Sequence, residues 1–179
     1  MEMSQQEKIR KNIKWSLGEE TESVGPGRQT DYMREVVGLP RVGRDIDSRP
    51  LLFGSLYYPS GETENVDAGN LPVIIYLHEY AYSLGYAGSG DIITRFVDAG
   101  FAVFAFDQIG FGTRIEEGRY FYERFPGWSK LGRMVADVRW AVDELSDMES
   151  IDNERIYVAG YALGGTVGLY STALDGRIA

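Results

Sequence analysis

The chain of 179 residues contains no cysteine and a single histidine. Without cysteine it can form neither disulfides nor thiolate metal sites, and one histidine leaves no cluster with metal-ligand spacing. We therefore expect no metal and no cofactor. The amino terminus lacks the apolar segment of a secretory signal, and no apolar run reaches membrane-spanning length. We expect a soluble chain without a signal peptide in this form, and its compartment stays open.

Positive charge is also scarce, because 18 lysines and arginines face 27 acidic residues and give a formal net charge of −9. Such a surface repels phosphate backbones and anionic lipids, so we expect neither nucleic acid nor a membrane as partner. Apolar residues are abundant at 44%, with 13% aromatic residues. This composition excludes a disordered chain and suffices for one packed domain.

The spacing of apolar residues divides the chain into two parts. Residues 1–30 are predicted to form a helix over 4–17, opened by a capping box at Ser4 and Glu7, and an acidic linker over 18–30. Residues 31–179 are predicted to form the domain itself. Its expected elements are strands 32–38 and 51–58, a hairpin-type polar loop 59–70, strand 71–77, helix 90–99 ended by Gly100, strand 101–106, a long helix capped by Ser129, strand 156–159 and helix 162–174. This alternation predicts parallel βαβ units and an α/β fold.

The segment after the last predicted strand carries the chemistry. It reads Gly160-Tyr161-Ala162-Leu163-Gly164-Gly165 and leads into a helix. A nucleophile elbow has the pattern G-x-S-x-G between a strand and a helix, and this segment matches it except for the serine. Small residues two before and two after the central position let the backbone close around a strained turn. The helix amino terminus beside the turn favours a developing anion.

Two further stretches complete a resemblance to α/β-hydrolases of the dienelactone-hydrolase and acetyl-xylan-esterase type, over roughly residues 50–179. They are Leu77-His78-Glu79-Tyr80 and Phe106-Asp107-Gln108-Ile109-Gly110-Phe111-Gly112, each after a predicted core strand. The resemblance implies an α/β-hydrolase fold, a mostly parallel sheet flanked by helices, of which this chain is the N-terminal part. It also implies a carboxylic-ester hydrolase that acts on a small-molecule or carbohydrate ester.

The resemblance assigns roles to the residues of these stretches. Ala162 takes the nucleophile position, Leu163 supplies the first oxyanion-hole N–H, and Tyr80 or its neighbour supplies the second. Glu79 replaces the usual glycine. Gly160, Tyr161, Gly164 and Gly165 shape the elbow. The catalytic acid and histidine of the family follow the nucleophile on later strands, so we expect neither in this chain.

His78 precedes the elbow, the wrong place in the triad order, and we interpret it as a structural residue that fixes the oxyanion loop. Asp107 is interpreted as a turn-forming residue. Arg114, Glu116 and Glu117 are expected to form a solvated charged face. Tyr82 and Tyr86 are candidates for stacking on a sugar ring, with packing as the alternative. For the aromatic residues between Tyr120 and Trp128 we favour packing as a lid or an interface.

Three explanations of Ala162 stay open. It is an engineered replacement in a serine esterase, as the intact glycines suggest. It is native in a pseudo-esterase that binds a ligand, as the second departure at Glu79 suggests. Or the domain has only a structural or interaction role. The genomic codon at position 162 separates the first explanation from the others, and binding of an acylated sugar separates the second from the third. Because the last predicted strand would expose a long apolar edge, we expect a longer chain, a second fragment or a partner subunit to complete the sheet.

Overall fold

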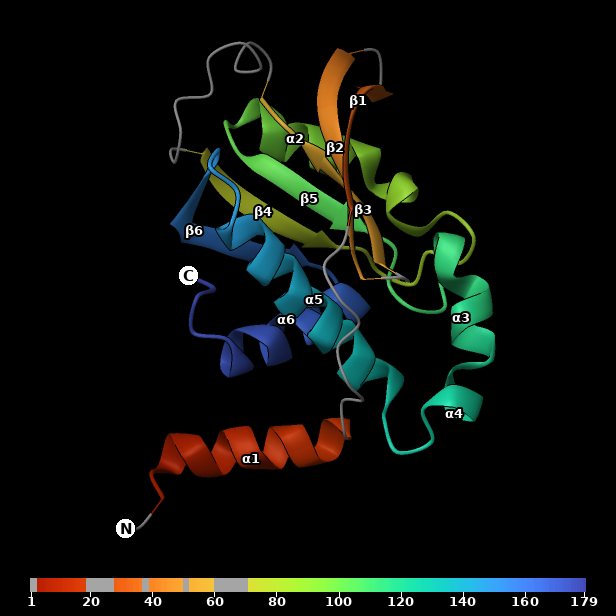
Figure 1. Ribbon diagram of the computed structural model, residues 1–179, viewed down its shortest axis with the longest axis vertical. Helices are drawn as coiled ribbons and strands as arrows, with labels where there is room; N and C mark the ends of the chain where they lie inside the picture. The colour runs from red at the N-terminus through yellow and green to blue at the C-terminus, as the bar shows by residue number, and fades with distance from the viewer. Residues whose placement is uncertain (1–2, 19–27, 37–38, 50–51, 60–70) are drawn as a thin grey trace.

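The computed structural model describes residues 3–18, 28–36, 39–49, 52–59 and 71–179. Within these residues one six-stranded sheet, in the order β1-β2-β3-β5-β4-β6, is flanked by helices on both faces (Figure 1). The strands are β1 (Arg28–Val36), β2 (Leu39–Arg49), β3 (Leu52–Tyr57), β4 (Leu71–Leu77), β5 (Ala102–Phe106) and β6 (Ile151–Gly160). The helices are α1 (Gln5–Leu17), η1 (Gly85–Ser89), α2 (Gly90–Asp98), η2 (Gly112–Arg114), α3 (Ile115–Arg119), α4 (Phe121–Arg124), α5 (Lys130–Ser146) and α6 (Leu163–Leu174).

The sheet has a parallel part and an antiparallel part. Strands β5, β4 and β6 run parallel, with Ile74 paired to Val103 on one side and to Tyr157 on the other. Strands β1, β2 and β3 are antiparallel to their neighbours, and β3 joins the parallel part through β5. The apolar runs of β4 and β5 are buried on both faces, as a central parallel strand requires. The predicted α/β fold is confirmed.

The antiparallel part differs from the prediction. The predicted strand 32–38 starts four residues earlier as β1, which also takes residues 28–30 from the predicted linker. Strand β2 was missed, because its charged sequence carries no apolar run and its place is set by pairing with β1 and β3. The hairpin prediction was wrong, since β3 pairs with β5 and not with β4. Residues 19–27 and 60–70, the rest of the predicted linker and polar loop, lie outside the described residues.

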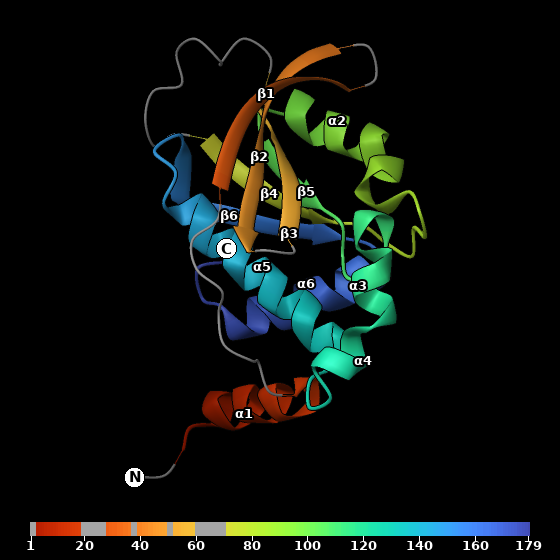
Figure 2. The same cartoon turned by 45° about the vertical axis from the view of Figure 1, so that its right-hand side comes forward.

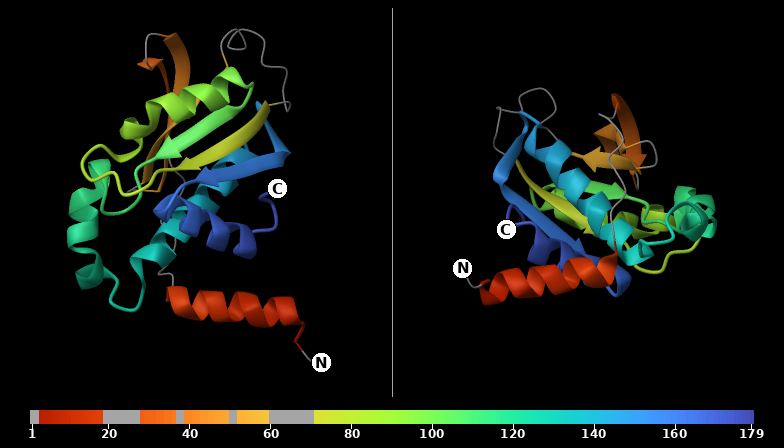
Figure 3. Two further views of the ribbon diagram at one scale, coloured as in Figure 1. Left: turned by 180° about the vertical axis from the view of Figure 1, so that it is seen from behind. Right: turned by 60° about the horizontal axis from the view of Figure 1, so that its bottom comes forward.

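Alternate residues of the central strands feed two hydrophobic clusters, one on each face of the sheet. The larger cluster takes Ile75, Phe104 and Phe106 and packs them against α5 and α6. The smaller takes Tyr76 and Val103 and packs them under α2. Figure 2 and Figure 3 show these helices on opposite sides of the sheet. Helix α5 is capped by the Ser129 hydroxyl, which accepts from the Gly132 N–H at 2.9 Å, as predicted.

Helix α1 lies below α5 and α6, at the end of the molecule far from the upper strands (Figure 1). Its capping box at Ser4 and Glu7 is confirmed. Leu17 is buried, and its carbonyl accepts from the Ser129 hydroxyl at 2.7 Å. The Arg10 Nε donates to the Ala173 carbonyl at 3.1 Å. None of the helices in the described part combines the length and the hydropathy that a bilayer crossing demands.

Candidate active site

The carboxyl ends of the three parallel strands meet at one edge of the sheet, where ligands bind in open α/β folds. The loop after β4 begins at His78, the loop after β5 begins at Asp107, and β6 runs directly into the turn at Ala162. The sequence therefore brings all three stretches that carried the resemblance to the same edge.

The turn between β6 and α6 has the strained geometry of an elbow. Ala162 has φ 50° and ψ −111°, a region that non-glycine residues rarely occupy. Among the described residues, Tyr82 is the other non-glycine residue with positive φ, at 46°, and it lies in the loop after β4. Such strain persists only where the surroundings enforce it, and it concentrates at functional sites.

Two glycines lie where the turn between β6 and α6 leaves no room for a Cβ. A Cβ on Gly160 would lie 2.5 Å from the carbonyl carbon of Gly164, and a Cβ on Gly164 would clash with the carbonyl oxygen of Leu77. The first turn of α6 thus packs directly on the end of β4. The N–H groups in the first turn of a helix have no partner within the helix, so the Leu163 N–H at this position can donate to an anion.

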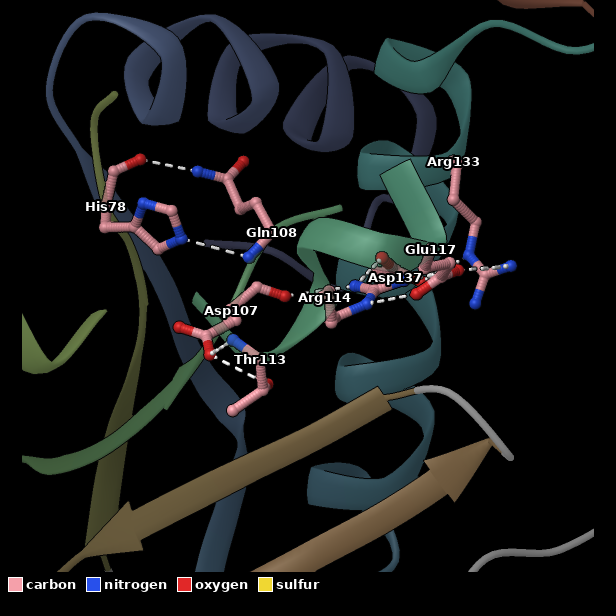
Figure 4. A network of polar contacts seen from close by, with 8 residues as sticks. All are labelled: His78, Asp107, Gln108, Thr113, Arg114, Glu117, Arg133 and Asp137. Atoms are coloured by element: carbon pink, nitrogen blue, oxygen red, sulfur yellow. Dashed lines mark hydrogen bonds and ion pairs between the residues drawn. The ribbon is translucent and has the colours of Figure 1, made fainter. Parts of the chain in front are cut away.

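His78 is fully buried, and both of its ring nitrogens are engaged. Figure 4 shows the bond between its Nε2 and the Gln108 N–H. Its Nε2 accepts from the Gln108 N–H at 3.0 Å, so Nδ1 carries the proton and donates to the Glu79 carbonyl at 2.6 Å. Burial lowers the pKa of His78 below its ordinary value, against a weaker opposite effect of the Glu79 carbonyl and Asp107. Both ring nitrogens of His78 thus bond to backbone groups, one in its own loop and one in the loop after β5, and the structural role of His78 stays a prediction.

Asp107 was expected to form a local turn, but its carboxylate bonds to residues of two different loops. One carboxylate oxygen accepts from the Tyr86 N–H at 3.0 Å, and the other accepts from the N–H and hydroxyl of Thr113 at 2.8 and 2.9 Å. The Gly112 N–H adds a bond of 2.7 Å to the Tyr82 carbonyl. These bonds join the loop after β4 to the loop after β5 and hold Tyr82 in its positive-φ conformation.

The tyrosines of the site separate into two groups. Tyr80, Tyr82 and Tyr161 are exposed, with 79% of Tyr82 and 72% of Tyr161 accessible to solvent. The Tyr80 ring rests edge-on against Phe111, with the ring centroids 5.9 Å apart. The Tyr86 hydroxyl instead hydrogen bonds to the Ser55 hydroxyl at 2.8 Å, and its ring packs against the smaller cluster. Tyr86 therefore holds the loop against the sheet.

The charged loop after β5 is not a solvated face, and that prediction was wrong for two of its three residues. The side chains of Arg114 and Glu117 are only 3% and 7% exposed, and that of Glu116 is exposed. Arg114 donates to Glu117 at 2.6 and 3.0 Å and to Asp137 at 2.5 Å. Burial acts to lower the pKa of Arg114, but the charges of Asp137 and Glu117 raise it above its ordinary value, so the guanidinium stays charged.

A second arginine completes a buried cluster of two cations and two anions. Arg133 donates to Asp137 at 2.8 Å, lies 3.4 Å from Glu117, and stacks 4.8 Å from the centre of the Trp140 ring. Sequence reasoning missed both Arg133 and Asp137. The available signal was their spacing of four on α5, beside the apolar residues Met134 and Val138.

The aromatic segment before α5 packs into the larger hydrophobic cluster, whereas a lid or an interface was expected from the sequence. Phe121 and Trp128 are buried, and the Phe125 ring lies 5.3 and 5.8 Å from theirs. Tyr120 and Tyr122 remain exposed.

The outer edge of β6 carries a short parallel bridge to the end of the chain. Ile156 pairs with Ile178, and the Ala179 N–H donates to the Ile156 carbonyl at 2.9 Å. Residues 178–179 thus lie where a further parallel strand would start.

With the geometry described, comparison with known proteins identifies the family. The family model described as "Serine aminopeptidase, S33" (Hydrolase_4) matches residues 72–177, more than half of the chain. The chain belongs to this family. The match covers the buried strands, the loop of His78, the loop of Asp107 and the elbow. It places the chain among the α/β-hydrolases, as the resemblance implied.

Individual relatives are distant and longer. Hydrolase LUC6 of Fusarium sp is 28% identical over 130 residues, which cover 71% of this chain and 28% of that protein. An acetyl xylan esterase from Paenibacillus sp. R4 superposes with a TM-score of 0.63 at 21% identity, over 86% of this chain and 52% of its own. Acetyl xylan esterase 1 from Thermoanaerobacterium sp. JW/SL YS485 superposes with a TM-score of 0.63 at 18% identity, over 97% of this chain and 55% of its own. At these identities the solved structures show a shared fold, and the chain spans about half of their length.

Proposed function

We propose that this chain forms the elbow and the oxyanion side of a carboxylic-ester hydrolase site in which Ala162 occupies the nucleophile position, so that the chain as given does not turn over esters. The observation that carries the proposal is the backbone of Ala162, held at φ 50° and ψ −111° between Gly160 and α6. Alanine gains nothing from this strain, whereas a nucleophile there would point into the site beside the first turn of α6.

Four residues would act at this site. The Leu163 N–H and the Tyr80 N–H would donate to the oxyanion of a tetrahedral intermediate. Exposed Tyr82 and Tyr161 would offer aromatic faces to the alcohol portion of the ester, with a sugar ring as the candidate. Tyr86 is not included, because its hydroxyl and ring are engaged inside the loop.

The acid and base of a triad are proposed to come from outside these 179 residues. The solved esterases are about twice as long as the part that this chain matches. The bridge between Ile156 and Ile178 supports a further parallel strand beside β6. A longer chain, a second fragment or a partner subunit would supply this strand and complete the sheet.

The test is hydrolysis of a small acetyl ester by the full-length parent, with and without Ala162→Ser. We expect the serine variant to raise kcat/KM by at least about 10³-fold, because loss of a triad nucleophile costs that much or more. Ala173→Ser makes the same chemical change further along α6 and serves as the matched control. If Ala162→Ser is folded but no more active than Ala173→Ser, the hydrolase proposal fails.

A second function is favoured by Glu79. Its side chain is exposed beside the oxyanion loop, where the family usually has glycine, and a carboxylate there opposes a developing negative charge. This favours a pseudo-esterase that binds an acylated sugar without hydrolysing it. Calorimetric titration of the Ala162 protein with an acetylated xylo-oligosaccharide tests this function. Binding that is weaker in Tyr82→Ala supports the pseudo-esterase function. If the Ala162 protein does not bind the oligosaccharide, only a structural role of the domain is left.

A further inference from the structure

Gln108 contacts His78 through two different groups. The backbone N–H of Gln108 donates to His78 Nε2 at 3.0 Å, and the side-chain Nε2 of Gln108 donates to the His78 carbonyl at 2.5 Å. Both residues are fully buried (Figure 4). One residue at the end of β5 therefore fixes both the ring and the peptide of the residue that opens the loop after β4.

The peptide held by Gln108 also touches the elbow. A Cβ on Gly164 would lie 3.0 Å from the His78 carbonyl oxygen, so this oxygen sits directly under the first turn of α6. The His78 ring in turn donates to the Glu79 carbonyl, whose peptide leads to the Tyr80 N–H. Any shift of His78 would thus change the position of the Tyr80 N–H relative to that of Leu163.

The side-chain amide of Gln108 has one buried atom without a hydrogen-bond partner in the described chain. Its Oε1 is buried and has no hydrogen-bond partner among the residues that the structure describes. The opposite amide orientation would turn Oε1 toward the His78 carbonyl oxygen and bring two acceptors together. A buried acceptor without a partner is unfavourable, so the bond that the Gln108 amide donates to the His78 carbonyl carries a cost in stability.

Its neighbour Asp107 faces a different pair of groups. Asp107 binds Tyr86 and Thr113, further along the same two loops. Two consecutive residues after β5 therefore hold the loop after β4 at its start and at its end. Of these two residues, Gln108 is the one that bonds to His78, two positions before the candidate oxyanion donor Tyr80.

We propose that Gln108 is a positioning residue for the oxyanion loop: by holding the ring and the carbonyl of His78 it sets the Tyr80 N–H against the first turn of α6. The catalytic part of this inference rests on the proposed function, while the positional part concerns the loop alone. Two measurements separate them.

The first measurement uses the Ala162 chain and needs no activity. His78 is the only histidine of these 179 residues. In the full-length Ala162 protein labelled with ¹⁵N-histidine, its ring signals are identified as the pair that disappears in His78→Gln. In the wild type we expect a single tautomer with the proton on Nδ1. Gln108→Met keeps the length of the side chain and removes its donor. We expect tautomer averaging and, at position 108, where the N–H donates to His78 Nε2, amide hydrogen exchange that is at least about 10-fold faster.

Ser171→Ala is the matched control, because it removes a buried side-chain bond to a carbonyl, that of Val167, without touching the loop. If Gln108→Met gives the ring signals and the exchange rate of Ser171→Ala, the positioning role is overturned. Should the methionine variant not fold, Gln108→Asn retains an amide that is one methylene too short, and the same two outcomes apply to it.

The second measurement places Gln108→Met in the full-length Ala162→Ser protein. Displacing an oxyanion donor removes stabilisation made in the transition state, so we expect kcat to fall about 10- to 100-fold with KM changed less than about 3-fold. A rise in KM with kcat unchanged overturns the role in oxyanion positioning. If Ala162→Ser itself is inactive while the loop of Gln108→Met loosens, the proposed function fails and the positional role stands.

Discussion

Two polar clusters attach the segment after β5 to the rest of the molecule, and Figure 4 shows them side by side. Near the elbow, His78, Gln108 and Asp107 bond mainly to backbone groups. Further along the segment, Arg114 and Glu117 form ion pairs with Arg133 and Asp137 of α5. The first cluster holds a loop in a strained conformation, and the second fastens the loop to a helix.

The two clusters differ in how they manage charge. In the α5 cluster, two positive and two negative side chains balance, and Asp137, which is fully buried, accepts from both arginines. In the elbow cluster, His78 stays neutral, and the one carboxylate, Asp107, accepts three hydrogen bonds. Buried charges need partners, and an oxyanion site works best where fixed dipoles rather than mobile charges surround it. The comparison suggests that the elbow cluster matters for geometry and the α5 cluster for stability.

The largest expected effect concerns Asp137. Asp137→Ala leaves two buried guanidinium groups short of an acceptor, so we expect the free energy of unfolding to fall by about 3–5 kcal/mol. Asp143→Ala removes an ion pair with Arg177 from the exposed side of the same helix and should cost less than about 1 kcal/mol. Urea unfolding of both variants measures the difference. Equal effects would mean that the buried cluster contributes no more than a surface pair.

The next effect concerns the glycine that packs on Asp107. Gly112 has φ 51°, and a Cβ there would clash with the Asp107 carboxylate, whereas Gly100 has φ 90° and open space around it. Gly100→Ala should cost about 1–2 kcal/mol, the strain of a left-handed residue. Gly112→Ala adds a steric clash and should cost about 3 kcal/mol. Thermal unfolding distinguishes them. If the two variants unfold alike, the contact with Asp107 is not tight.

A smaller effect follows from the pKa of His78, which burial lowers below its ordinary value of 6.5. The unfolded chain then binds a proton at a pH where the folded chain does not. The contribution of His78 to the free energy of unfolding is therefore complete above pH 6.5. It decreases by at most about 1.4 kcal/mol per pH unit as the pH falls from 6.5 through the pKa of His78 in the folded chain. His78→Gln should remove this part of the pH dependence. An identical pH profile in the variant would show that His78 is protonated equally in both states.

The smallest effect compares two buried oxygens without partners in the described chain, Gln108 Oε1 and Thr94 Oγ1. Thr94→Val removes only such an oxygen and should leave stability unchanged or raise it by less than about 1 kcal/mol. Gln108→Met also removes the donor to His78 and should lower stability by about 1 kcal/mol. Denaturant midpoints of the two variants test this. A neutral Gln108→Met would show that its side-chain bond contributes nothing to stability.

Much of the fold followed from local patterns. The runs at β4 and β5, the cap at Ser129 and the stop at Gly100 each have a local cause, and each was placed within a residue or two. Strand β2 and the pairing of β3 with β5 were not predicted, because their causes are contacts between segments far apart in the chain. The burial of Arg114 was missed for the same reason, since its partner Asp137 lies 23 residues away.

The sequence by itself determined the elbow and the strands that meet there. Glycines at 160 and 164 and a run of apolar residues are local requirements of a strained turn at the end of a buried strand. The tertiary structure alone decided which polar residues became buried and how they pair. Gln108 and His78, or Arg114 and Asp137, are separated by 30 and 23 positions, and no local pattern records that they meet. Burial raises the cost of every unpaired polar group, so the partners are selected by the folded geometry and not by their spacing in the chain.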